Sequence, residues 1–159
     1  MNIKKYLLLA CCLLLCVMLS GCGSSSENGA PLSCSQIAEK AQTAASFTAL
    51  TDVNESYLEK YLMIEADDLE EWVMRRDATR ATPEMILVLK VKSGANQAEI
   101  KKAVQEYHEE QLLQYRDYQP AQVYKLEDAK VLENNSYIVL IVSPDASKVT
   151  TALGSGWKE

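Results

Sequence analysis

The sequence has 159 residues, a formal net charge of −6 and a single histidine. The acidic balance argues against a nucleic-acid partner, which requires a clustered basic surface. The length suits one domain that buries an ordinary hydrophobic core without disulfide bonds or metals to stabilise it.

Residues 1–21 have the pattern of an export signal. Lys4 and Lys5 form a short basic stretch, and the run from Tyr6 to Leu19 contains no charged residue. This run has 14 residues, fewer than the roughly 20 apolar residues that a membrane-spanning helix needs. We therefore predict a signal peptide rather than a transmembrane helix.

The signal ends in Leu19-Ser20-Gly21-Cys22, which resembles the lipobox of bacterial lipoproteins. The resemblance implies that diacylglycerol is attached to the Cys22 thiol and that cleavage makes Cys22 the first mature residue. Two acyl chains suffice for stable anchoring, at about 0.8 kcal/mol per buried CH₂. We therefore expect a protein anchored on the extracytoplasmic face of the cell membrane; the alternative is an ordinary secretory signal with a chance cysteine.

Residues 22–32 are expected to form a flexible tether, because they are mostly small or polar and show no periodicity. A coil of this length reaches about 17 Å, so the single folded domain, residues 33–159, is expected to lie close to the bilayer. Loss of Lys4 and Lys5 with the signal leaves 14 basic and 22 acidic residues, a charge of −8. This charge argues against a second, polybasic contact with anionic lipid.

Only one of the five cysteines, Cys34, remains as a free thiol after signal cleavage and lipidation of Cys22. This count excludes a disulfide bond or a thiolate metal cluster within one mature chain. Cys34 shares a helical face with Ile37 and Ala41, so we expect a small buried side chain. A reactive thiol or a disulfide bond between two chains is the alternative.

Two helices are expected before the first strand. Ser33 and Gln36 form a capping box, and the apolar stripe after them predicts a helix over Cys34–Phe47. A shorter helix is expected over Ser56–Leu62. The acidic run Asp67–Glu71 lacks the spacing and the glycine of an EF-hand loop, so we interpret it as a solvated turn rather than a calcium site.

Two strands and the longest helix follow. We interpret Trp72–Arg76 as a strand, and branched apolar residues predict a stronger strand over Met85–Val91. The intervening loop, Asp77–Glu84, would let these strands pair antiparallel. The helix is expected to begin after an N-cap at Asn96 and to continue to about Asp117.

The C-terminal part is expected to contain two more strands and a short helix. The strands are Lys130–Glu133 and Tyr137–Val142, joined by a turn at Asn134–Ser136, where asparagine tolerates left-handed backbone. The second strand is apolar on both faces, which predicts a central position. Ser143-Pro144 is expected to start the last helix, and Gly154 follows its end.

These elements predict a single α+β domain. We expect a mainly antiparallel sheet of about four strands with helices packed on one face. The sequence contains no repeat with the period of a solenoid or a propeller.

Three segments resemble a known family: Ala81–Lys92, the helix end at Tyr118–Pro120, and Asn135–Leu140. They are similar to the Firmicutes lipoproteins grouped as domain of unknown function 4358, over roughly Glu55–Lys148. Members of that family favour glycine where this chain has Asn135, a difference that concerns only the turn. The resemblance implies a lipid-anchored protein of a Gram-positive envelope and supplies no catalytic residue.

The sequence shows no recognisable catalytic, metal or cofactor motif. His108 has Val104 and Leu112 as its neighbours one helical turn away, and neither can bind a metal. We therefore interpret His108 as a solvated or half-buried helix residue. Ser155 and Lys158 match the Ser-x-x-Lys spacing of penicillin-interacting enzymes but lack the accompanying motifs, so we interpret the match as chance.

The sequence has eight tyrosines and one phenylalanine, and two interpretations of the tyrosines are open. Tyr107, Tyr115, Tyr118 and Tyr124 are candidates to line a groove for a glycan or a peptide, because tyrosine offers an apolar face and a hydrogen-bonding tip. The alternative is that these residues lie at the edge of the core with their hydroxyls in water.

Two functional hypotheses follow. The leading one is a non-enzymatic, membrane-tethered module that binds or scaffolds an envelope protein or glycan. The alternative is a small envelope hydrolase that uses carboxylates such as Glu70, Glu71 or Glu84. Solute capture for a transporter is disfavoured, because one domain of this size cannot form a two-lobed clamp.

Overall fold

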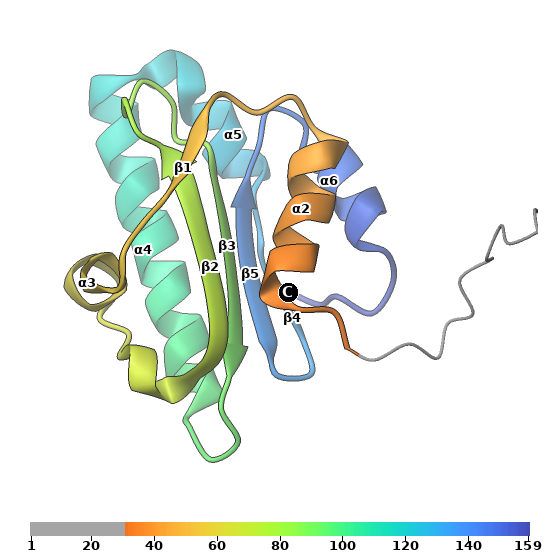
Figure 1. The fold of residues 1–159 in the computed structure, drawn as a ribbon. Coiled ribbons are helices and arrows are strands. Elements are labelled where there is room, and N and C mark those ends of the chain that lie inside the picture. Colours follow the sequence, from red (N-terminus) through yellow and green to blue (C-terminus); the bar gives the residue numbers. More distant parts are fainter. Residues whose placement is uncertain (1–30) are drawn as a thin grey trace, which may run out of the picture. The chain divides into compact units, whose positions relative to one another are not determined.

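A five-stranded antiparallel sheet forms the centre of the computed structural model, which describes residues 31–159 (Figure 1). The strands are β1 (Leu50–Asp52), β2 (Leu69–Asp77), β3 (Met85–Val91), β4 (Val131–Asn134) and β5 (Tyr137–Val142), in the spatial order β1-β2-β3-β5-β4. The helices are α2 (Cys34–Ala44), α3 (Glu55–Tyr57), α4 (Gln97–Tyr118), α5 (Val123–Asp128) and α6 (Ala146–Leu153). Shorter turns are the π-helical η2 (Leu58–Leu62) and the 3-10 turns η3 (Ala66–Asp68) and η4 (Pro120–Gln122).

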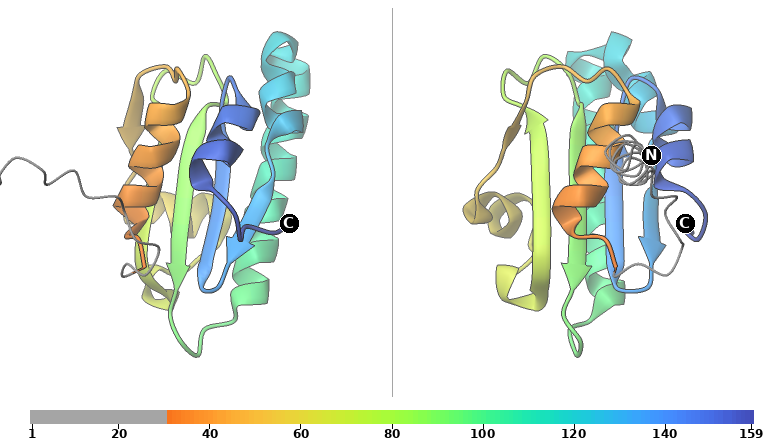
Figure 2. Two further views of the ribbon diagram at one scale, coloured as in Figure 1. Left: turned by 90° about the vertical axis from the view of Figure 1, so that its right-hand side faces the viewer. Right: turned by 45° about the vertical axis from the view of Figure 1, so that its right-hand side comes forward.

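Helices cover both faces of the sheet (Figure 2). Side chains of a strand alternate between faces, so Leu87 and Leu89 pack in the core beneath α4 and α5, whereas Ile86 and Val88 pack beneath α2 and α6. The prediction of a single α+β domain with an antiparallel sheet is confirmed. Two details differ: the sheet has five strands, and helices cover both faces instead of one.

The predicted long elements are confirmed. Ser33 and Gln36 form the expected capping box, although α2 ends at Ala44, before Phe47. Asn96 caps α4, and its side chain accepts a hydrogen bond from the Glu99 backbone. Every residue of β5 is buried, as its apolar sequence predicts for a central strand.

Two short elements were not predicted, and the start of α6 was misplaced. Strand β1 and helix α5 have three and six residues and weak apolar patterns. The N-cap of α6 is Asp145 and not Ser143, which is buried and accepts a hydrogen bond from the Asp145 backbone. Hydrogen bonds from Lys148 and Ser147 lower the pKa of Asp145 to about 2, so its charged form caps the helix.

The N-terminal end of the described domain lies far from the β2–β3 loop. The Tyr137 hydroxyl donates a 2.7 Å hydrogen bond to the carbonyl oxygen of Leu32, and Tyr137 pairs with Lys90 near the end of β3. The β2–β3 loop joins the other end of β3, about 20 Å away at roughly 3.3 Å per residue. The chain therefore enters the domain at one end of the sheet, and this loop lies at the opposite end.

No helix within residues 31–159 is long and apolar enough to cross a membrane. The predicted signal peptide and Cys22 lie outside the described residues.

Candidate functional site

A groove of about 630 Å³ opens between α4, the α3–η2 segment and the end of β2. Four tyrosines and two arginines line it: Tyr57, Tyr61, Tyr115, Tyr118, Arg76 and Arg80. We call it the tyrosine–arginine groove. Its volume lies within the range of about 300–1,000 Å³ that is typical of ligand sites.

One wall of the groove is a stack of aromatic and guanidinium groups. Tyr57 and Tyr61 are one helical turn apart, and their ring centroids lie 4.4 Å from each other. Arg76 lies over the Tyr57 ring, 5.1 Å from its centroid, and donates a hydrogen bond to the Tyr57 hydroxyl. That hydroxyl is 3.0 Å from the hydroxyl of Tyr107, which is buried in the core. The stack therefore holds the half-buried Arg76 guanidinium against a rigid support.

Another lining residue, Tyr115, holds the β2–β3 loop in place. Tyr115 of α4 is buried, and its hydroxyl donates to the carbonyl oxygens of Thr82 at 2.7 Å and Arg80 at 3.2 Å. Burial raises the pKa of Tyr115, so this donor stays protonated. Arg80 has a φ of 59°, a left-handed conformation that costs an ordinary residue about 1–2 kcal/mol. The hydrogen bonds from Tyr115 help to hold this conformation.

The groove has a positive character in an acidic chain. Among residues 31–159, neither Arg76 nor Arg80 has a carboxylate within ion-pair distance. Glu110 is the one acidic side chain among the lining residues of the described domain. Within residues 31–159, two guanidinium groups therefore face the groove without an ion-pair partner.

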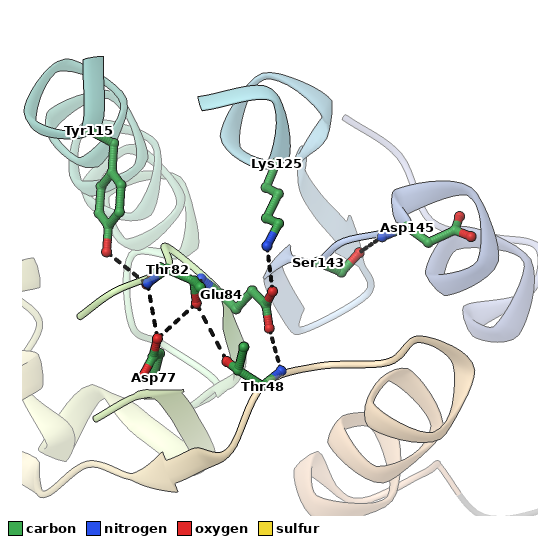
Figure 3. A network of polar contacts seen from close by, with 8 residues as sticks. All are labelled: Thr48, Asp77, Thr82, Glu84, Tyr115, Lys125, Ser143 and Asp145. Atoms are coloured by element: carbon green, nitrogen blue, oxygen red, sulfur yellow. Dashed lines mark hydrogen bonds and ion pairs between the residues drawn. The ribbon is translucent and has the colours of Figure 1, made fainter. Parts of the chain in front are cut away.

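A buried ion pair lies beside the β2–β3 loop (Figure 3). Lys125 of α5 contacts Glu84 with 2.6 Å between Nζ and Oε1, and their side chains are 8% and 2% exposed. The second oxygen of Glu84 accepts a 2.6 Å hydrogen bond from the Thr48 backbone. Both oxygens of this carboxylate are therefore satisfied by the fold, which assigns Glu84 a structural role.

Asp77 organises the same loop from its other end. It accepts four hydrogen bonds, from the backbone and hydroxyl groups of Thr79 and Thr82, at 2.7–3.0 Å. Burial by itself raises the pKa of Asp77, but these hydrogen bonds outweigh it, and the net pKa lies below its ordinary value of 3.8. The charged carboxylate therefore stabilises the folded loop.

Asp77→Asn is expected to lower the free energy of unfolding by about 2 kcal/mol at pH 7, because the amide cannot replace all four hydrogen bonds to the carboxylate. The folded pKa lies below the unfolded value of 3.8, so the contribution of Asp77 is complete above that pH and is lost as the pH falls through the folded pKa. Urea unfolding from pH 7 to 2.5 should show the gap between wild type and variant closing below about pH 4.

Asp52→Asn is the control for this series, since that carboxylate is 78% exposed and pairs with Arg75 at the surface. We expect it to change stability by under about 1 kcal/mol at every pH. A constant gap between wild type and Asp77→Asn down to pH 2.5 would contradict the assignment of Asp77.

The four tyrosines considered as candidates for a groove divide between three places. Tyr115 and Tyr118 line the tyrosine–arginine groove. Tyr107 is buried behind it, where burial raises its pKa, and Tyr124 is not among the lining residues. Tyr57 and Tyr61 were not predicted as groove residues, although their i, i+4 spacing in a predicted helix was a usable signal, and neither arginine was predicted.

The carboxylates proposed for a hydrolase do not all converge. Glu70 and Glu71 lie near the start of β2, where Glu70 forms an ion pair with Lys90 at 2.9 Å. Glu84 lies at the opposite end of the β2–β3 ladder and is buried. A pair of carboxylates that acts on one bond must lie within about 5–10 Å of each other, so Glu84 cannot act together with Glu70 or Glu71.

The remaining candidates have structural surroundings. Cys34 is fully buried, as predicted, and burial raises the pKa of its thiol to about 12. His108 is half-buried with Nε2 at 2.8 Å from the carbonyl oxygen of Leu126. The backbone of Lys158 pairs with Glu133 of β4. In the part of the chain that the structure describes, no three His, Cys, Asp or Glu side chains are grouped to hold a metal ion.

Comparison with known proteins supports the family and leaves the role open. No curated protein and no solved structure matches the chain. A family model described as domain of unknown function (DUF4358) matches residues 43–143. This match includes β1 to β5, the β2–β3 loop and the whole of α4. The chain therefore belongs to the DUF4358 family.

Proposed function

We propose that the protein is a lipid-anchored, non-enzymatic binding module that holds a component of the cell envelope in the tyrosine–arginine groove. The groove itself carries this proposal. It combines exposed aromatic rings with two guanidinium groups that have no carboxylate partner within residues 31–159. Such a mixture of apolar surface and a few fixed polar groups is typical of ligand sites.

The position of the groove suits an anchored receptor. If Cys22 carries the lipid, the tether joins the domain at Leu32, beside the start of β5. Arg76 and Arg80 lie at the opposite end of the sheet. A ligand could then approach the groove from the side away from the point of attachment.

The arrangement of carboxylates favours binding over hydrolysis. Hydrolysis by two carboxylates requires both in one cleft, whereas Glu70 and Glu71 are separated from Glu84 by the length of the β2–β3 ladder. Glu110 is the one carboxylate of the described residues that lines the groove. We therefore prefer a binding role to the alternative of a small envelope hydrolase.

Photo-crosslinking on intact cells tests this proposal. A benzoylphenylalanine at Tyr118, which lines the groove and is 81% exposed, is expected to give discrete crosslinked products. The same probe at Leu113, which is on α4, 62% exposed and outside the groove, is the matched control and should give none of them. Identical products from both positions, or uncrosslinked protein alone from Tyr118, would overturn the groove as the binding site.

A further inference from the structure

The two arginines of the groove are arranged to receive an anion. Arg76 uses part of its guanidinium in the hydrogen bond to Tyr57, and a guanidinium has five N–H donors. Arg80 is exposed and comes from the loop four residues later, yet it lines the same cavity. Guanidinium groups bind carboxylate and phosphate through paired, charge-assisted hydrogen bonds. An anionic group is therefore the natural occupant of the space that Arg76 and Arg80 share.

The other lining residues supply contacts for hydroxyl groups and for an apolar ring face, in addition to the contacts for an anion. Three glutamines of α4 and its C-terminal end, Gln111, Gln114 and Gln119, line the cavity. Each amide carries both donors and acceptors, which suits hydroxyl groups that also do both. Tyr61 and Tyr118 add rings that are 43% and 81% exposed, and such rings present a flat apolar face beside a polar tip. This combination matches a ligand with a sugar ring.

We propose that the ligand is a saccharide that carries a carboxylate or a phosphate group, a proposal that rests on the binding function above. The anion binds Arg76 and Arg80, the hydroxyls bind the glutamine amides, and a sugar face packs on Tyr118. An acidic peptide would satisfy the arginines, but it would leave the array of amides without a matching set of hydroxyls. A neutral glycan would leave both guanidinium groups unpaired.

Calorimetric titration of the full-length protein tests the ligand class. The protein is kept in a polyoxyethylene detergent, which has no sugar headgroup to compete. The probes are trigalacturonate, glucose 1-phosphate, neutral galactotriose, inorganic phosphate and triglutamate. We expect at least one of the two anionic saccharides to bind at least tenfold more tightly than galactotriose, inorganic phosphate and triglutamate. Which of the two binds identifies the carboxylate or the phosphate as the anion.

Three variants locate the bound saccharide. Arg80→Gln is expected to weaken the binding of anionic saccharides about tenfold, which is the loss expected for one charge-assisted contact. Arg116→Gln removes an exposed charge on α4 outside the groove, where Arg116 pairs with Glu127, and should leave binding unchanged. Tyr118→Ala should weaken the binding of anionic saccharides but leave any binding of inorganic phosphate unchanged, because only the sugar packs on the ring.

The outcomes distinguish a wrong ligand class from a wrong binding function. Equal binding of galactotriose, tighter binding of triglutamate, or no loss in Arg80→Gln would overturn the anionic saccharide. So would the absence of binding by both anionic saccharides up to about 10 mM. The crosslinks from Tyr118 would survive each of these results, because they report occupation of the groove by any ligand. Loss of those crosslinks would instead overturn the proposed function itself.

Discussion

Lys125→Met is expected to lower the free energy of unfolding by about 3–5 kcal/mol, the cost of leaving a buried charge without its partner. Methionine fills much of the space of the lysine stem, so the main loss is the contact of 2.6 Å between Nζ and Glu84. The Glu84 side chain is 2% exposed and water cannot replace the ammonium. Guanidinium chloride unfolding measures the change.

Two further variants distinguish the effect of the buried charge on stability from the effect of side-chain packing. Glu84→Gln/Lys125→Met removes both charges of this pair, and glutamine still accepts the hydrogen bond from the Thr48 backbone. We expect this double variant to regain a large part of the lost stability. Lys102→Met breaks an exposed pair with Glu106 and should cost under about 1 kcal/mol. A cost for Lys125→Met no larger than that of Lys102→Met would show that the buried pair does not stabilise the fold.

Cys22→Ala is expected to abolish incorporation of a fatty-acid probe and to reduce the membrane-bound fraction strongly. The thioether of a lipobox cysteine is the point of lipid attachment, and the two acyl chains supply most of the membrane affinity. The folded domain should be unaffected, because the chain enters it ten residues later, at Leu32. Metabolic labelling with an alkyne fatty acid, followed by membrane fractionation, measures both effects.

Cys34→Ala is the matched control for Cys22→Ala. Cys34 is fully buried and burial raises the pKa of its thiol to about 12, so it is not a target for acylation in the folded protein. This variant should keep its label and its membrane fraction. Labelling that persists in Cys22→Ala would contradict the proposed lipid anchor.

The elements that the sequence predicts well are those with strong local signals. β5 is an unbroken run of apolar, mostly branched residues, β3 is a similar run interrupted only by Lys90, and α4 has both an N-cap and a long amphipathic pattern. β1 and α5 lack such signals, because a three-residue edge strand and a six-residue helix depend on their neighbours. β1 forms by pairing with Arg75–Asp77 of β2, and Lys125 of α5 forms its ion pair with Glu84 of the β2–β3 loop.

The prediction that helices pack on only one face of the sheet was wrong for a related reason. The apolar runs of β3 and β5 predict strands that are buried on both sides, but they do not say which elements cover each side. The short apolar stripe of α2, with Cys34, Ile37 and Ala41, packs on the face away from α4. Contacts between distant segments decide this layering, and no local pattern records them.

The sequence by itself determined the export signal pattern, the α+β class and the long elements, and it favoured a buried Cys34, since each depends on composition or periodicity along a continuous stretch. It also gave Tyr115 and Tyr118 as candidates for a groove. Only the tertiary structure decided that α3–η2, the end of β2 and α4 bring Tyr57 and the two arginines to the same groove. The physical reason is that a binding site is assembled by packing between segments that are far apart in the chain, whereas helices and strands are encoded by neighbouring residues.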